Sequence, residues 1–139
     1  MITKNNFIKI MNSQTEMALA TSVKDIPSVR IINFYFDTNT NTVFFTSFKK
    51  NKKIKEFQIN QNIGFTTIPK NGVEHVKGNG IVKESDKNII DVSNNFINKI
   101  PDYKELIENF SEYLTLFEIK VDTVTVTLNF ENIETIKLE

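Results

Sequence analysis

The sequence predicts a mainly β fold: a small closed or nearly closed antiparallel barrel of six or seven strands, with short helices between some of them. Short runs of β-branched and aromatic residues recur along the whole chain. Turn-forming residues separate these runs, and the helical patterns between them are brief. A barrel also removes exposed strand edges, which otherwise promote aggregation.

The first part of the chain predicts a short helix and then a three-stranded meander. Between residues 5 and 12, apolar residues recur at helical spacing and form one apolar face. Turn-forming clusters rich in Asp, Asn, Thr and Pro follow at 24–27 and 37–41. The segments around these turns have the composition of strands. The predicted strands are 17–23, 28–36 and 42–46.

The middle of the chain predicts a crossing helix and two more strands. Asn51 is a suitable N-cap for a helix that ends by residue 60. The turn residues Pro69–Gly72 join strands predicted at 63–68 and 74–82. Gly78 and Gly80 lie inside the second of these strands. Glycine in a strand indicates a bulge, a barrel corner or the close approach of a ligand or another backbone.

The last part predicts two helices and a closing strand. Apolar residues between residues 86 and 110 recur at helical spacing, and Pro101 interrupts them. Glu105, Glu108 and Glu112 recur at the same spacing and indicate an exposed helix face. Residues 113–128 then predict a long or broken strand, which a short tail follows.

Length and composition limit the function. A chain of 139 residues without repeats or linkers predicts a single domain, 1–139. It has no cysteine and one histidine, so we predict no metal site and no thiol chemistry. No segment approaches the ~20 apolar residues of a membrane span, and we expect a cytoplasmic protein without membrane contact. The formal net charge is zero, which argues against a general polyanion binder.

Arg30 is the only arginine of the chain and lies in the predicted strand 28–36. Its planar guanidinium can bind phosphate or carboxylate through two hydrogen bonds at once, and it stays charged at physiological pH. Near this strand we therefore expect either a bound anion or a salt bridge to a glutamate or aspartate. The segment itself leaves both alternatives open.

Five lysines lie among the seven residues 49–55, where the crossing helix begins. Cations are unfavourable at a helix N-terminus, whose free N–H groups attract phosphate instead. The cluster indicates either an anion held by Lys52 and Lys53 or a solvated basic face. Nucleic acid is the weakest alternative, since the net charge is zero and no recognition helix or aromatic RNA-binding motif is found.

The sequence identifies no catalytic residue. His75, the single histidine, either hydrogen-bonds a ligand, acts as an acid or base, or faces solvent. Motifs of nucleotide-binding loops and of serine hydrolases are absent from the sequence.

Five short segments are informative through their order and spacing. They are Ala18–Ser22, Pro27–Ile32, Val43–Ser47 together with Lys52 and Lys53, Gln61–Phe65, and Val76–Gly80. In this order they resemble the pyridoxamine 5′-phosphate oxidase-like family of FMN-binding split barrels. The similarity extends from about residue 15 to residue 84, and no single motif carries it. It implies a split barrel in which FMN explains Arg30, the lysine cluster and the strand glycines together.

The resemblance implies that FMN lies against two strands. The first would line the flavin, with its backbone bonded to the ring edge. The end of the second would reach the ribityl and phosphate region. These residues are Arg30, Ile31, Ile32 and Asn33 on the first strand, and Phe45, Thr46 and Ser47 on the second.

The resemblance also assigns the phosphate. The basic pair of the family falls on Lys52 and Lys53, after a loop about one residue longer than in the oxidases. Either lysine of this pair, or the neighbouring Lys50, would hold the phosphate. A glutamine that approaches the flavin in the oxidases falls on His75, which is a substitution.

The same resemblance implies a homodimer with two FMN sites at the subunit interface, each built from both chains. True pyridoxamine-phosphate oxidases have a C-terminal tryptophan and a substrate-binding arginine, whereas this sequence has no tryptophan and no second arginine. We therefore expect a flavin-dependent oxidoreductase for another, unidentified small molecule. A non-catalytic flavin-binding or sensing module stays an alternative, as does deazaflavin in place of FMN. Related split barrels also hold haem, which in this sequence would require the single histidine, His75, as its axial ligand.

Overall fold

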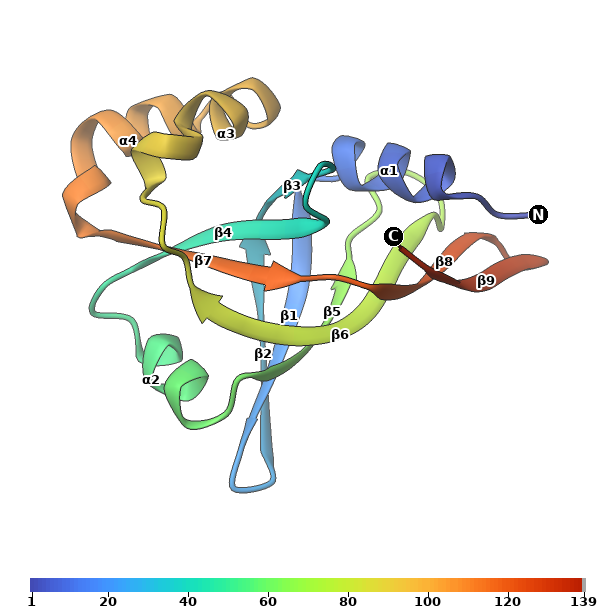
Figure 1. The fold of residues 1–139 in the computed structure, drawn as a ribbon, viewed down its shortest axis with the longest axis horizontal. Helices are drawn as coiled ribbons and strands as arrows, with labels where there is room; N and C mark the ends of the chain where they lie inside the picture. The colour runs from blue at the N-terminus through green and yellow to red at the C-terminus, as the bar shows by residue number, and fades with distance from the viewer. Residues whose placement is uncertain (139) are drawn as a thin grey trace.

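The computed structural model describes residues 1–138, and its centre is one nine-stranded antiparallel sheet that curls into a half-barrel (Figure 1). Seven strands pair in the order β2-β1-β5-β6-β7-β4-β3, while β8 pairs with β6 and β9. This arrangement confirms the predicted mainly β split barrel. The strands are β1 Glu16–Val23, β2 Ile26–Asn33, β3 Tyr35–Asp37, β4 Thr42–Phe48, β5 Asn62–Thr67, β6 His75–Glu84, β7 Leu114–Lys120, β8 Thr123–Asn129 and β9 Asn132–Lys137.

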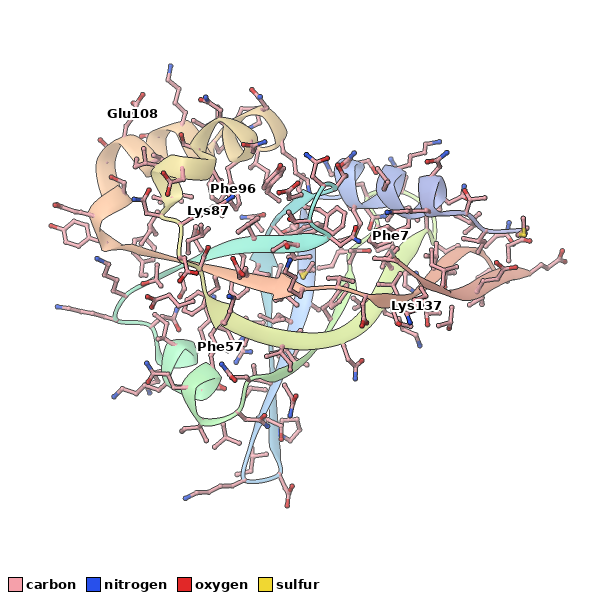
Figure 2. The ribbon with its side chains drawn as sticks, viewed as in Figure 1. Phe7, Phe57, Lys87, Phe96, Glu108 and Lys137 are labelled. Atoms are coloured by element: carbon pink, nitrogen blue, oxygen red, sulfur yellow. The ribbon has the colours of Figure 1, made fainter. Side chains whose placement is uncertain are left out.

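Short helices lie around the sheet, where the sequence predicted them. Asn51 is the N-cap of α2, and its Oδ1 accepts a hydrogen bond from the Lys53 backbone N–H at 3.0 Å. Pro101 lies between α3 and α4, as predicted. Glu105, Glu108 and Glu112 are exposed, and Figure 2 shows Glu108 pointing away from α4. The helices are α1 Lys4–Ser13, α2 Lys52–Ile59, α3 Ser93–Lys99 and α4 Tyr103–Phe110, with 3₁₀ turns at Ile89–Val92 and Ser111–Tyr113.

The strand count exceeds the predicted six or seven for three reasons. The predicted strand 28–36 is interrupted at Phe34, so β2 pairs with β1 whereas β3 pairs with β4. The predicted strand 113–128 is broken after β7 and continues as β8. The segment predicted as a tail is β9, which pairs only with β8. Its side chains are mostly exposed, so no alternation of apolar and polar residues marks it as a strand.

The barrel is split between β2 and β4. β2 pairs with β1 along its whole length, and β3 pairs with β4 only as far as Phe44. On its other side, β4 pairs with β7 along its whole length, from Thr42 to Phe48. Within residues 1–138, no strand therefore fills the space between β2 and the C-terminal half of β4. Backbone N–H and C=O groups on these two edges are left available to a ligand.

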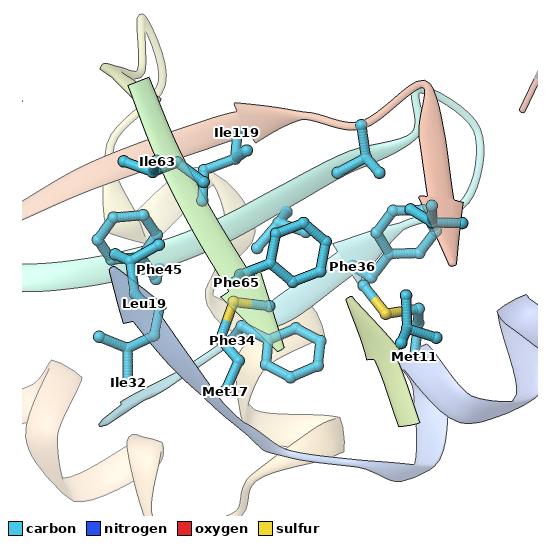
Figure 3. Close-up of a cluster of buried hydrophobic side chains, with 14 of the residues drawn as sticks. Met11, Met17, Leu19, Ile32, Phe34, Phe36, Phe45, Ile63, Phe65 and Ile119 are labelled. Carbon is cyan, nitrogen blue, oxygen red and sulfur yellow. The ribbon is translucent and has the colours of Figure 1, made fainter. Parts of the chain in front are cut away.

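The main core fills the barrel, and helices close its ends (Figure 3). Phe7 of α1 packs edge-on against Phe36 at a ring-centroid distance of 5.2 Å. Phe57 of α2 packs against Phe45 and Phe117. Each such side chain contributes about 1.5–3 kcal/mol when it is fully buried. A second cluster, between α3, α4 and the outer face of β4, includes Phe44, Phe96 and Tyr103.

β6 changes its partner at Gly78 and Gly80. Residues 75–78 pair with β8, and residues 81–84 pair with β7. A Cβ atom at Gly80 would lie 2.7 Å from Cγ2 of Ile119 and 3.2 Å from the Lys120 carbonyl oxygen. Of the alternatives raised for these glycines, the barrel corner accounts for Gly80, because internal packing there leaves no room for a side chain.

The helices within residues 1–138 include none that combines the length and the apolar character needed to cross a membrane.

Candidate functional site

A cleft of about 220 Å³ lies at the split of the barrel, between β2, β4 and the first turn of α2. α4 covers it from a third side. Residues far apart in the sequence meet here because β2 and β4 diverge after their connection through β3. The cleft is lined by six of the residues that the sequence assigned to a ligand: Ile31, Ile32, Asn33, Thr46, Ser47 and Lys53.

Four other assigned residues do not line this cleft within one chain. Phe45 is fully buried, and its ring stacks on Phe117 at a centroid distance of 5.4 Å inside the barrel. Lys52 is exposed at the start of α2. Arg30 lies beside Lys53 but is bound by protein groups, and His75 lies at the start of β6 near a different pocket. The structure therefore brings together part of the assigned set.

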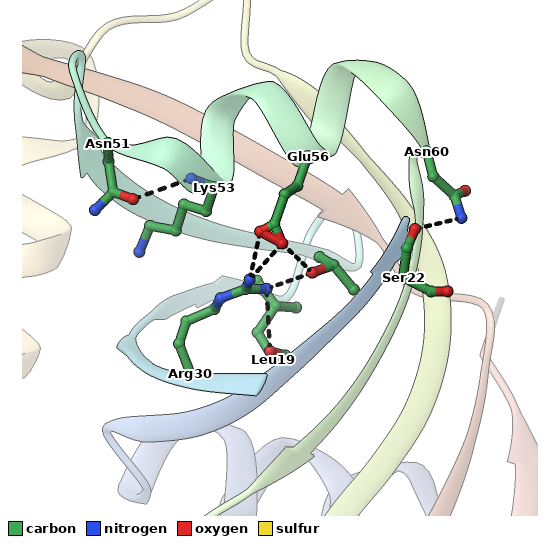
Figure 4. Close-up of polar contacts among 8 residues, drawn as sticks. Leu19, Ser22, Arg30, Asn51, Lys53, Glu56 and Asn60 are labelled. Atoms are coloured by element: carbon green, nitrogen blue, oxygen red, sulfur yellow. Dashed lines mark hydrogen bonds and ion pairs between the residues drawn. The ribbon is translucent and has the colours of Figure 1, made fainter. Parts of the chain in front are cut away.

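Arg30 is held in a compact hydrogen-bonded group (Figure 4). Its Nη2 donates to both carboxylate oxygens of Glu56, each at 3.1 Å. Its Nη1 donates to Thr21 Oγ1 at 2.9 Å and to the Leu19 carbonyl oxygen at 3.4 Å. Thr21 Oγ1 in turn donates to Glu56 at 3.0 Å. Of the two alternatives left open for Arg30, the salt bridge is therefore present.

Lys53 supplies the positive charge that lines the cleft. It lies in the first turn of α2, and its side chain is half-buried. Burial lowers the pKa of Lys53 below its usual 10.5, and the nearby charge of Arg30 lowers the pKa further. An anion at this position would reverse both effects, because it would stabilise the ammonium form.

His75 lies in a different environment. Its Nδ1 is 2.7 Å from the Val73 carbonyl oxygen, so this nitrogen donates a hydrogen bond, and Nε2 is not part of that bond. The adjoining pocket measures about 490 Å³ and is lined by Val73, Phe130 and Ile133, among others. The exposed fraction of Phe130 is 86%, which is high for a phenylalanine.

Tyr103 is a residue of the cleft that the sequence did not indicate. Its ring stacks on Phe96 at a centroid distance of 4.9 Å, and the residue is buried. Burial raises the pKa of Tyr103, while hydrogen-bonding interactions with the side chains of Thr46 and Asn33 lower it. Tyr103 thus lines the cleft together with Asn33 from one side of the split and Thr46 from the other. No sequence motif marks it, since the contact depends on how α4 packs over two strands.

The lining combines three kinds of group. Ile31, Leu106 and Leu114 are apolar, whereas Asn33 and Thr46 offer hydrogen bonds. Together with the free strand edges and the ammonium of Lys53, this composition suits a flat, largely apolar ligand with a polar edge and an anionic end. Among the side chains that the structure describes, no three His, Cys, Asp or Glu residues are grouped as a metal site requires.

The chain resembles known proteins in sequence and in fold. Residues 10–132 match the family described as pyridoxamine 5′-phosphate oxidase-like. A protein from Listeria innocua described as a candidate pyridoxamine 5′-phosphate oxidase has the same fold, with a TM-score of 0.70 and 15% identity. The match covers 91% of this chain and 98% of that protein. No curated protein matches the sequence.

Two further solved structures share the fold. A haem-binding protein from Mycobacterium smegmatis aligns with a TM-score of 0.76 and 8% identity over 95% of this chain. The aligned part is 56% of the mycobacterial protein, so this chain spans little more than half of its length. An FAD-binding protein from Mesorhizobium loti aligns with a TM-score of 0.66 and 15% identity, over 88% of this chain and 92% of that one. At such identities the likeness demonstrates a common fold.

Proposed function

The chain belongs to the pyridoxamine 5′-phosphate oxidase-like family, and from this premise we propose that it binds FMN in the cleft between β2 and β4. The observation that supports this proposal most directly is the cleft itself. It is bordered by two strand edges that lack a partner strand, and Lys53 lies in its wall. Six residues assigned to flavin by family resemblance line it.

The residues of the cleft fit the parts of the cofactor. The backbone of Ile31–Asn33 would bond the edge of the flavin ring, and the hydroxyl groups of Thr46 and Ser47 would bond the ribityl chain. Lys53, with Arg30 beside it, would face the phosphate. When bound, the isoalloxazine ring would supply the electron-transfer chemistry. The chain would position the ring and keep water from one of its faces through Tyr103 and Leu106.

A second copy of the chain would complete the site. The cleft of about 220 Å³ is smaller than the pockets of roughly 300–1,000 Å³ that enclose ligands of this size. Beside the cleft, β2 exposes an apolar face: the exposed fractions are 71% for Val29 and 62% for Ile31. Such a face is typical of an interface. We propose a homodimer in which this face is covered, and in which His75 approaches the flavin of the other chain.

We propose that the bound flavin serves an oxidoreductase acting on a small molecule. Without the tryptophan and second arginine of the true oxidases, that molecule is not expected to be pyridoxamine phosphate. Steady-state oxidation of NADH or NADPH by the FMN-loaded protein, with and without candidate acceptors, tests the catalytic part. A protein that retains FMN but oxidises neither nucleotide would be a flavin-binding module instead.

The absorption spectrum of the purified protein tests FMN binding. It is recorded before and after FMN is added and unbound flavin is removed by desalting. Flavin bands that remain with the protein support the proposal, and featureless spectra in both samples contradict it. Lys53→Ala should retain less FMN than the wild type, whereas Lys104→Ala, on the exposed face of α4, should retain as much.

Haem is a second candidate, which the surroundings of His75 favour. Its Nε2 is available as an axial ligand, because Nδ1 bonds the Val73 carbonyl oxygen. The neighbouring apolar pocket is about 490 Å³. Proteins of the same fold from Mycobacterium smegmatis and Vibrio cholerae are described as haem-binding and haem-storage proteins. Addition of haemin in place of FMN tests this candidate: a Soret band shifted from that of free haemin, and lost in His75→Ala, would support it.

A further inference from the structure

Beside Lys53, at the proposed phosphate end of the cleft, the protein carries a negative charge of its own next to the cleft lining. Arg30 and Lys53 are close enough for the charge of Arg30 to lower the pKa of Lys53. Glu56 binds Arg30 through both carboxylate oxygens at 3.1 Å. A phosphate that approached Arg30 would meet a guanidinium whose Nη2 group already binds a carboxylate.

The position of Glu56 follows from α2. Lys53 and Glu56 are three residues apart in this helix and therefore point to the same side, toward β1 and β2. Among the described residues, the ion pair of Glu56 is with Arg30 and not with Lys53. Thr21 stabilises the ion pair between Arg30 and Glu56, because its hydroxyl group is hydrogen-bonded to both side chains.

The charges around the phosphate end do not cancel completely. Arg30 and Lys53 contribute two positive charges and Glu56 one negative charge, which leaves a net charge of one (2 − 1 = +1). The pair is not deeply buried: the side chains of Arg30 and Glu56 are 19% and 25% exposed. Solvent and ligand can therefore reach it, and neutralising the carboxylate would double the positive charge that a phosphate meets.

We propose that Glu56 is a specificity-determining residue of the cleft, which limits its preference for ligands that end in a phosphate dianion. Glu56 binds the guanidinium of Arg30, whereas Lys53 has no ion pair within residues 1–138. The inference rests on the proposed flavin site, since FMN and riboflavin, which differ only in the phosphate, are its probes. It assigns to Glu56 a role in selectivity beyond that of holding Arg30 in place.

The test compares the dissociation constants of riboflavin and FMN in the same protein. The ratio of the two constants isolates the contribution of the phosphate to binding. If the role of Glu56 were purely structural, its replacement would change both constants by the same factor and leave the ratio unchanged. Glu56→Gln keeps the shape and one acceptor oxygen but removes the charge. We expect it to raise the riboflavin-to-FMN ratio about tenfold, the scale of one charged hydrogen bond made available. Glu56→Asp keeps the charge and should leave the ratio near the wild-type value.

A matched control is available in Glu118. This carboxylate is also largely buried and ion-paired, with Lys83 at 3.4 Å, and it accepts a hydrogen bond from Ser85 at 2.9 Å. Glu118→Gln changes the total charge by the same amount, but Glu118 is paired with Lys83 and not with Arg30, so it should not alter the ratio. Circular dichroism and urea unfolding verify that each variant is folded. Glu56→Ala is the second neutral variant if Glu56→Gln is unfolded, and the same increase is expected.

Each outcome separates this inference from the proposed function. If the wild type prefers FMN and the neutral variants do not raise the ratio, the inference is wrong while the FMN site stands. If the wild type retains no FMN but Glu56→Gln does, the inference holds and the proposed FMN function of the natural protein fails. If no protein in the series binds FMN or riboflavin, both are overturned.

Discussion

At the scale of single residues, the placement of positive charge decides what the cleft can bind. Arg30 and Lys53 lie close together, and Glu56 compensates the charge of Arg30 alone. Lys99, in the last turn of α3, is a second cation in an unusual environment. Its Nζ donates to the Met11 carbonyl oxygen at 2.8 Å and lies 3.7 Å from the centroid of the Phe34 ring.

Arg30→Ala is expected to weaken FMN binding by about 1.5–3 kcal/mol, because a charged hydrogen-bond donor is lost and Glu56 keeps its negative charge near the phosphate. Quenching of flavin fluorescence on titration measures the dissociation constant. The double variant Arg30→Ala/Glu56→Gln should recover part of the affinity, since the unpaired carboxylate is then removed. Full affinity in Arg30→Ala would contradict the phosphate assignment.

The stability of the protein should depend on pH through Lys99. Burial, and then the charge of Lys70, lower the pKa of Lys99 from 10.5 to about 7 in the folded protein. Between these two values the unfolded chain binds a proton that the folded protein does not. The free energy of unfolding therefore rises with pH over this range, and the contribution is constant below and above it.

Lys99→Met should remove this contribution, because methionine has no proton to exchange. Urea unfolding at several pH values between about 7 and 10.5 measures the free energy of unfolding of each protein. Lys104→Met, which changes an exposed lysine of α4, should keep the dependence of the wild type. A Lys99→Met protein with an unchanged dependence would show that another group is responsible.

At the scale of elements, β6 is the strand that joins the two parts of the sheet. Its first half pairs with β8 and its second half pairs with β7. The strand therefore bends where it changes from one partner to the other. Gly80 lies at this bend, against the side chain of Ile119. Gly64 of β5 pairs with Asn79 of β6, and a Cβ atom at Gly64 would meet no atom closer than ordinary van der Waals contact. These two glycines therefore have different reasons for their place in the sheet.

Gly80→Ala is expected to destabilise the protein by about 1–3 kcal/mol, the usual cost of overpacking a well-packed interior. The added Cβ would lie 2.7 Å from Ile119 Cγ2, so the strand or that side chain must move. In Gly64→Ala the nearest atom is the Gly78 carbonyl oxygen at 4.0 Å, and stability should be unchanged or slightly higher. Urea unfolding of both variants measures the difference. Equal stabilities would refute the barrel-corner interpretation of Gly80.

At the scale of the whole molecule, the split barrel has two exposed edges that a closed barrel would not have. The cleft lies between β2 and β4, and the outer face of β2 next to it is apolar. Natural proteins seldom leave such a strand uncovered, because it promotes aggregation. This is the physical argument for the homodimer, independent of the argument from the size of the cleft.

Val29→Glu should convert the proposed dimer to a monomer, because a carboxylate would be buried without a partner at the centre of the apolar face. Size-exclusion chromatography with light scattering measures the mass of wild type and variant. The monomeric variant should also retain less FMN. Ile90→Glu is the control, because Ile90 lies in the 3₁₀ turn Ile89–Val92, outside the apolar face of β2. The exposed fraction of its side chain is 57%, against 71% for Val29. This variant should have the same mass as the wild type. A monomeric wild type would disprove the proposed dimer.

The sequence by itself determined the local elements and the family. The meander, the Asn51 cap and the break at Pro101 follow from patterns within a few residues, which local backbone preferences govern. The order of short segments identified the family that the match over residues 10–132 establishes. For the cleft, family resemblance indicated six lining residues on β2, β4 and α2, because strand order fixes which segments are neighbours.

Only the tertiary structure decided the contacts that set the charge and the lining of the cleft. The pairing of Arg30 with Glu56 instead of an external anion depends on how α2 lies across β1 and β2. The contact of Tyr103 with both sides of the split depends on the packing of α4. β9 pairs with β8 through backbone hydrogen bonds, and its side chains show no alternation of buried and exposed residues that would mark it as a strand in the sequence. These contacts join residues distant in sequence, and their energies depend on distance and burial, which local patterns do not encode.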